Sequence, residues 1–104
     1  MVGLKKYSVF SIQLDPLMIL VKNIQFSRNI KAAISIKEFN FRKLQSAQEP
    51  MYQIDVSDER GNRHFFSMHL VDGQWKIQGP LIVNWILEAE PLLHQAIEHR
   101  EAQT

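Results

Sequence analysis

Residues 51–79, which decide the fold, read MYQIDVSDERGNRHFFSMHLVDGQWKIQG. Asp72-Gly73 is a pair typical of a two-residue type I′ hairpin turn, because both central residues of that turn need a positive φ. Upstream, Glu59–Gly61 predicts a three-residue loop that ends on a glycine in the left-handed region. Two hairpins joined in this way predict a three-stranded antiparallel meander.

The two turns also predict how the strands pair. In the register that they impose, the large apolar side chains of all three strands collect on one face. A slip of one residue in either hairpin would scatter them over both faces, so the apolar pattern supports both turns. The predicted cross-strand pairs are Leu70–Trp75, Met68–Ile77, Val56–His64, Ile54–Phe66 and Tyr52–Met68.

The stretch after the meander has a helical period. Its apolar residues recur at spacings of three and four, which predicts an amphipathic helix, and Pro80 ends the preceding strand by removing a ladder donor. Pro91 predicts either a kink or two abutting segments with this proline in the first turn of the second. We expect the inner face of the meander to be covered by Ile82, Trp85, Ile86, Ala89, Leu92, Leu93, Ala96 and Ile97.

The N-terminal half is harder to interpret. Alternating apolar residues predict a strand over Lys5–Leu14, while Leu17–Phe26 fits either a buried strand or a helix opened by Asp15-Pro16. We expect a break at Ser27–Asn29 and then one long strand over Ile30–Leu44. In that strand Phe39 and Phe41 have the opposite parity to Ala32, Ile34 and Ile36, so a bulge near residues 37–38 is needed if all five face inward.

These elements predict a single α+β domain over residues 1–104. The expected architecture is a curved, mostly antiparallel sheet of five to six strands, with the meander at its C-terminal end, packed against the C-terminal amphipathic helix. With 104 residues, 45% of them hydrophobic and 22% charged, the chain has the composition of a soluble globular domain.

The absence of cysteine rules out disulfides and thiolate metal sites and predicts a reducing, cytoplasmic location. The longest apolar run, Leu17–Val21, has five residues, whereas a membrane-spanning helix needs about 20. We therefore expect a soluble protein with no membrane contact.

The net charge of +1 conceals an uneven distribution. Residues 1–52 carry eight basic and three acidic side chains, a net +5, and residues 53–104 carry four basic and eight acidic side chains, a net −4. Two oppositely charged surfaces would favour a protein partner or a second copy of the chain.

No pattern in the sequence indicates an enzyme. His64 and His69, like His94 and His99, are five residues apart, which suits neither one helix face nor one strand face for metal binding. We expect no metal and no cofactor. Asp58-Glu59 is the candidate for acid–base chemistry, although carboxylates beside a turn are usually only solvated. A nucleophile elbow and a phosphate-binding glycine loop are both missing.

The outward face of the meander is the candidate ligand or interface surface. The same register arranges its side chains in cross-strand rows of amides, hydroxyls and charges, which suit hydrogen bonding to a polar ligand or contact with a partner. The residues are Gln53, Ser67 and Gln78 in one row, Met51, His69 and Lys76 in a second, and Asp55 with Phe65 in a third.

Single-stranded nucleic acid is an alternative ligand. Lys37, Phe39, Phe41 and Lys43 share one parity, which interleaves aromatic rings with positive charge as in single-strand binders. The same two phenylalanines are also candidates for the hydrophobic core, and no ribonucleoprotein consensus is present.

Taken together, the sequence favours a non-enzymatic module that binds a protein partner or self-associates. The alternatives are single-stranded nucleic-acid binding through the basic N-terminal half, and a small enzyme or ligand-binding protein with its site on the open sheet face.

Overall fold

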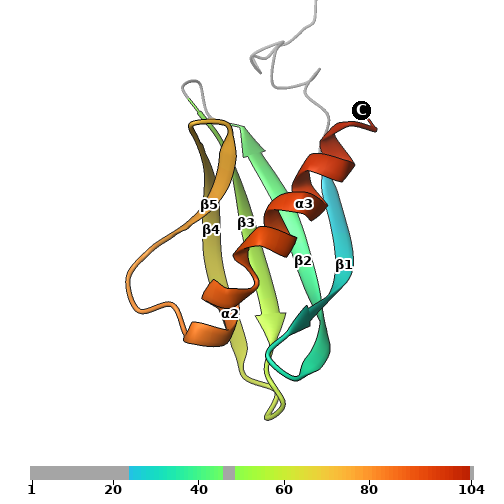
Figure 1. Cartoon of the computed structure of the whole chain (residues 1–104), viewed down its shortest axis with the longest axis vertical. Helices are drawn as coiled ribbons and strands as arrows, with labels where there is room; N and C mark the ends of the chain where they lie inside the picture. The colour runs from blue at the N-terminus through green and yellow to red at the C-terminus, as the bar shows by residue number, and fades with distance from the viewer. Residues whose placement is uncertain (1–23, 46–48, 104) are drawn as a thin grey trace, which may run out of the picture.

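The computed structural model of the chain describes residues 24–45 and 49–103. Five strands form one antiparallel sheet in which each strand pairs with its neighbour in sequence, and two helices cover one of its faces (Figure 1). The predicted α+β class and the C-terminal helix are confirmed. The elements are β1 (Gln25–Ala32), β2 (Ser35–Gln45), β3 (Pro50–Ser57), β4 (Arg63–Val71), β5 (Gln74–Gln78), α2 (Asn84–Glu88) and α3 (Glu90–Glu101).

Both predicted turns of the meander are confirmed. Asp72 and Gly73 have φ values of 52° and 81°, as a type I′ turn requires. In the upstream loop Gly61 has a φ of 85°, and the Asp58 N–H donates to the Asn62 carbonyl at 2.9 Å to close the loop. All five predicted cross-strand pairs are observed.

The core lies between the inner face of the sheet and the helices. Tyr52 and Trp75 are its largest fully buried side chains, and their rings meet edge to face with centroids 5.1 Å apart. Of the eight apolar residues in the five predicted pairs, which were expected to face inward, Leu70 is an exception because it is 45% exposed. Leu70 lies two residues before the β4–β5 turn, and Figure 1 shows that α3 runs away from this turn towards β1.

The C-terminal helix is two abutting segments, one of the two predicted forms. Pro91 lies in the first turn of α3, and Ala89 links the two segments with a φ of −83°. Ile86, Ala89, Leu93, Ala96 and Ile97 are buried as predicted, while Ile82 and Trp85 are partly buried against the core. Leu92 is 42% exposed, which corrects its predicted place on the covered face.

Glu101 ties the C-terminal end of α3 to the sheet. Its Oε2 accepts hydrogen bonds from Lys43 Nζ at 2.6 Å and from the Tyr52 hydroxyl at 2.9 Å. Burial, and then the bond to Glu101, raises the pKa of the Tyr52 hydroxyl above its usual value. Donors from β2 and β3 thus hold the last turn of the helix over the core.

The predicted break at Ser27–Asn29 and the single long strand over Ile30–Leu44 are wrong. Strand β1 runs through residues 27–29 without interruption, and the chain reverses at Ala33-Ile34, where Ala32 pairs with Ser35. Ala33 has a φ of 60°, in a two-residue turn that would usually take glycine at a left-handed position.

The conditional bulge near residues 37–38 is also absent, because the registers of β1 with β2 and of β2 with β3 are continuous. Ile34 and Ile36 are 94% and 70% exposed, whereas Phe39 and Phe41 are buried. The five apolar residues of this segment therefore do not all face the core, and the charged residue Lys37 occupies an inward position.

Two predictions fall outside the residues that the structure describes. These are the strand over Lys5–Leu14 and, apart from its last three residues, the choice between strand and helix over Leu17–Phe26. At the end of the second segment Ile24 is buried and Gln25 and Phe26 begin β1. In the part of the chain that is described, no helix is long and apolar enough to cross a membrane.

Candidate functional site

The outward face of the meander has the predicted rows. Gln53 pairs with Ser67 and Ser67 with Gln78, Met51 pairs with His69 and His69 with Lys76, and Asp55 pairs with Phe65. Two members of these rows have partners within the chain: His69 Nδ1 lies 3.1 Å from Glu49, and Lys76 lies 3.8 Å from Glu90. The placement is therefore confirmed, and ligand binding at these rows stays a prediction.

The residues considered for nucleic-acid binding point into the core. Phe39 and Phe41 are 0% and 2% exposed, and Phe41 stacks on Phe26 with ring centroids 4.4 Å apart. Lys37 pairs with Glu59 and lies over the Trp85 ring, while Lys43 pairs with Glu101. The sequence hypothesis needed exposed rings for base stacking, and these two rings do not supply them.

The same ion pairs bear on the uneven charge of the two halves. Lys37–Glu59 and Lys43–Glu101 each join a basic side chain of residues 1–52 to an acidic side chain of residues 53–104. Part of the opposite charge is thus neutralised within one chain, which weakens the electrostatic argument for the pairing of copies.

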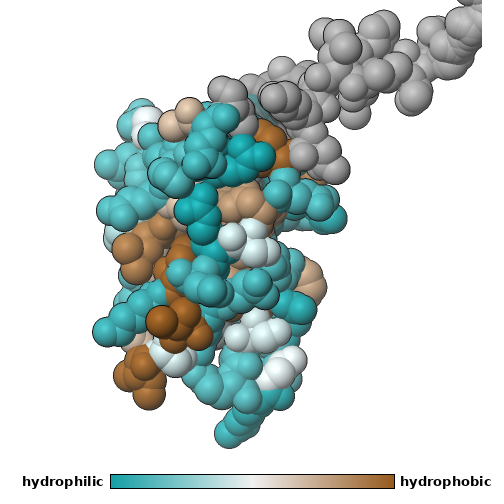
Figure 2. Space-filling model, turned by 90° about the vertical axis from the view of Figure 1, so that its right-hand side faces the viewer, coloured by the Kyte–Doolittle hydropathy of each residue, from teal (hydrophilic) through white to brown (hydrophobic). Residues whose placement is uncertain are grey.

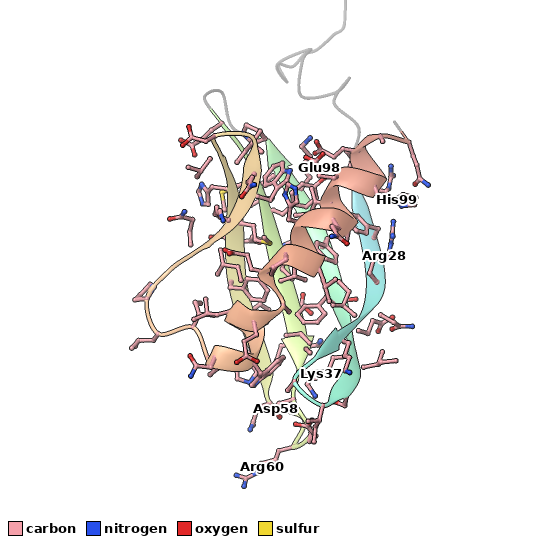
Figure 3. The ribbon with its side chains drawn as sticks, viewed as in Figure 1. Arg28, Lys37, Asp58, Arg60, Glu98 and His99 are labelled. Atoms are coloured by element: carbon pink, nitrogen blue, oxygen red, sulfur yellow. The ribbon has the colours of Figure 1, made fainter. Side chains whose placement is uncertain are left out.

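Asp58 and His64 form a pair that only the fold brings together. His64 Nε2 lies 3.1 Å from Asp58 Oδ2, and Asp58 Oδ1 accepts from the N–H groups of Arg60 and Asn62, both at 2.9 Å. The bond to His64, followed by these backbone bonds, lowers the pKa of Asp58 from 3.8 to about 2. Asp58 thus closes the loop between β3 and β4, at the end of the sheet where Figure 3 labels it.

This pair does not make a catalytic site by itself. A carboxyl group with so low a pKa is a weak base, and within residues 24–45 and 49–103 no hydroxyl group hydrogen-bonds His64 as a nucleophile would. Its neighbour Glu59 also has a lowered pKa, caused chiefly by the hydrogen bond from Lys37. Across the described ranges, no three histidines or carboxylates gather as metal ligands either.

The lowered pKa of Asp58 predicts how stability depends on pH. Between about pH 4 and pH 2 the unfolded chain binds a proton at Asp58 that the folded chain does not, so the free energy of unfolding falls as the pH falls. Asp58→Asn should flatten this decline, as measured by urea unfolding at a series of pH values, while Asp72→Asn in the other turn serves as the control. An unchanged slope in Asp58→Asn would contradict the assignment.

The two edge strands of the sheet, β5 and β1, differ in the hydrogen bonds that their outward backbone groups make. The Trp75 N–H donates to His94 Nδ1 at 3.0 Å, and the Ile77 N–H donates to Glu90 Oε2 at 2.8 Å. Both acceptors are side chains of α3, one helical turn apart. Because these two N–H groups point away from β4, they would otherwise be free to pair with another strand. Helix α3 therefore caps the β5 edge.

The β1 edge has no such cap from the residues that the structure describes. The Lys43 N–H donates to the Ile24 carbonyl at 2.9 Å, so the hydrogen-bonded positions of β1 alternate from Ile24 onwards. The intervening residues Gln25, Ser27, Asn29 and Lys31 direct their backbone groups away from β2. In the described part of the chain no hydrogen bond is made to these outward groups.

A groove of about 500 Å³ runs between this open edge and α3. Arg28 of β1 and His99 of α3 approach each other at 3.2 Å across it, with the guanidinium group donating to the imidazole, and Figure 3 shows them side by side. Figure 2 faces this side of the molecule and shows hydrophobic surface broken up by hydrophilic side chains. The lining residues are Arg28, Asn29, Ile30, Lys31, Leu92, Gln95, Ala96 and His99.

The chemistry of the groove combines an apolar floor with positive charge. Leu92, Ala96 and Ile30 supply the apolar surface, and Arg28 and Lys31 supply two cations, while no carboxylate of residues 24–45 or 49–103 lines the groove. An extended segment beside β1 would meet free backbone groups, apolar contacts and positive charge together. We call this combination the β1 groove.

Reasoning from the sequence missed the β1 groove. The incorrect break at residues 27–29 divided β1, and the incorrect long strand hid the fact that this segment is an edge. The exposure of Leu92 in an otherwise buried apolar stripe is a consequence of packing that periodicity does not show. Comparison of the chain with family models, with curated proteins and with solved structures finds no match.

Proposed function

We propose that this domain is a non-enzymatic partner-binding module that takes an extended, acidic segment of a protein partner into the β1 groove. The observation that carries the proposal is the contrast between the two sheet edges. Side chains of α3 cap the N–H groups of β5, whereas no residue within 24–45 or 49–103 bonds the outward backbone groups of β1, which lie beside a lined groove. Addition of a strand to an exposed sheet edge is a recurring mode of peptide recognition.

The groove geometry says how such a segment would bind. Its backbone would pair with the outward groups of Gln25, Ser27, Asn29 and Lys31, which recur every second residue. Alternate side chains of the segment would lie over Leu92 and Ala96 of α3, since strand side chains alternate between faces. The backbone bonds provide affinity, and the contacts of the side chains provide selectivity.

Charge distinguishes an acidic partner from two other occupants. In an antiparallel pairing of β1 with β1 of a second copy, both copies would bring the same cations, Arg28 and Lys31, to the junction. Residues 1–23 of the chain itself carry Lys5, Lys6 and Lys22 against the single acid Asp15. A segment rich in Asp or Glu complements the groove, whereas both of these occupants bring more positive charge to it.

Fluorescence polarisation with a labelled peptide that alternates valine and glutamate tests the proposal. We expect this peptide to bind and its lysine counterpart not to bind. Asn29→Pro should weaken binding by about tenfold or more, because proline removes an outward N–H without removing a ladder bond to β2. Asn29→Ala retains the N–H group and should bind within about twofold of the wild type.

A charge variant distinguishes binding at the β1 groove from non-specific attraction of the acidic peptide to any positive charge. Lys31→Glu should weaken binding of the acidic peptide, whereas the matched change Arg60→Glu, at an exposed loop tip away from the β1 groove, should not. Equal binding by wild type and Asn29→Pro would contradict the proposal. Light scattering completes the test, because a dimer that Asn29→Pro dissociates would show that a second copy occupies the edge instead.

A further inference from the structure

A second hollow lies on the opposite face of the sheet from α3. It measures about 460 Å³ and crosses strands β1 to β4. This volume falls within the range of small-molecule pockets, about 300–1,000 Å³. The outward side chains that matter for its chemistry are Gln25, Asn40, Arg42, Gln53, Asp55 and Phe65.

A chain of hydrogen bonds holds the polar side chains of this hollow in place. Ser27 Oγ donates to Asn40 Oδ1 at 2.7 Å, and Asn40 Nδ2 donates to Asp55 Oδ1 at 2.9 Å. Arg63 Nη1 donates to the same Asp55 oxygen at 3.0 Å. The carboxylate and the amide are therefore oriented before any ligand arrives, which reduces the entropy cost of binding.

The same network leaves donors and acceptors for a ligand. Both bonds to Asp55 use Oδ1, so Oδ2 has no partner within residues 24–45 and 49–103. Arg42 Nη2 donates to Gln53 Oε1 at 2.7 Å, which leaves the Gln53 amide nitrogen and the other guanidinium N–H groups available there. The lining itself holds one cation, Arg42, and one anion, Asp55, and the ion pair from Arg63 offsets much of the negative charge of Asp55.

Phe65 adds an aromatic surface at the side of the hollow. Its side chain is 74% exposed, and the residue is the cross-strand partner of Asp55. An exposed aromatic side chain on a polar sheet face is not explained by the core, which takes Phe66 from the next position along β4. Aromatic rings offer a flat, polarisable face to C–H groups, while neighbouring polar groups bind hydroxyls.

From this arrangement we infer that the outer-face hollow binds a neutral sugar, in the form of a hexose or a short oligosaccharide. Each sugar hydroxyl is both a donor and an acceptor, and the lining presents carboxylate, amide and guanidinium groups together. The C–H face of a pyranose ring would lie on Phe65 while its hydroxyls reach Asp55, Gln53 and Arg42. This site is separate from the β1 groove and does not depend on the partner proposed there.

Saturation-transfer NMR with cellobiose and maltose tests the inference. We expect saturation to pass from the protein to the C–H protons of at least one of these two sugars. Glucuronate and glucosamine serve as charged probes and should bind no better than the neutral sugars. Phe65→Ala should weaken binding about tenfold, the amount expected for loss of an aromatic contact together with its buried area. Val71→Ala, an exposed apolar residue on the same face of β4, should leave binding unchanged.

A second variant keeps the test decisive. Gln53→Ala removes one polar contact from an exposed position and should also weaken binding, with circular dichroism used to confirm that both variants are folded. Absence of saturation transfer from both neutral sugars, or equal binding by wild type and Phe65→Ala, would overturn the inference. Stronger binding of either charged probe would also overturn it, because the site would then select a charged ligand and not a neutral sugar.

Discussion

Phe41→Ala is expected to lower the free energy of unfolding by about 3–5 kcal/mol, the usual cost of removing a buried phenylalanine. The ring is 2% exposed, stacks on Phe26 at 4.4 Å and meets Tyr52 at a steep angle of 82°. Small domains are stable by about 5–15 kcal/mol, so the change removes a large share of the total. Urea unfolding followed by circular dichroism measures it through the transition midpoint.

Phe65→Ala is the matched control, because it removes the same side chain from the outward face. With 74% of that ring exposed, we expect a change of less than about 0.5 kcal/mol. If both variants unfolded at the same urea concentration, the assignment of the two faces would be wrong. Phe41 would then be available for stacking as the nucleic-acid hypothesis requires.

Removal of the caps on β5 is expected to have the second largest effect. In His94→Ala the Trp75 N–H loses its acceptor, and in Glu90→Ala the Ile77 N–H loses its acceptor. A buried or half-buried N–H left without a partner costs about 1–3 kcal/mol. We expect each variant to lose stability in that range, measured by urea unfolding against Gln95→Ala on the exposed side of the same helix.

The uncapped edge should also associate with other strands, because exposed edges pair readily. Light scattering of the double variant His94→Ala, Glu90→Ala should show larger oligomers than the wild type forms at the same concentration. Glu90→Gln retains a carbonyl oxygen as acceptor and should recover most of the stability. Alanine variants as stable as Gln95→Ala, with no gain in association, would show that the caps are not needed.

The meander was predictable because its signals are local and agree with one another. Asp72-Gly73 and Gly61 adopt positive φ values where few other residues do so at low cost, and period-2 alternation then determines the register. Pro91 similarly required an interruption of the C-terminal helix, because its ring is incompatible with a continuous helix interior.

The first hairpin was not predictable in the same way. Its turn contains Ala33 at a φ of 60° and the exposed Ile34, neither of which is a turn residue by composition. The pairing of β1 with β2 and of β2 with β3 imposes this conformation from outside the turn. Tertiary structure thus overrode local propensity at this turn. The turn also makes β1 the outermost strand of the sheet, which creates the open edge.

The sequence by itself determined the α+β class, the register of the three C-terminal strands, and the face on which their apolar side chains lie, since all of these depend on neighbours a few residues apart. Only the tertiary structure decided which sheet edge is capped, that Asp58 meets His64, and that Leu92 lies beside Arg28 and Lys31. Those contacts depend on the path of α3 across the sheet, and side-chain packing between distant segments determines that path.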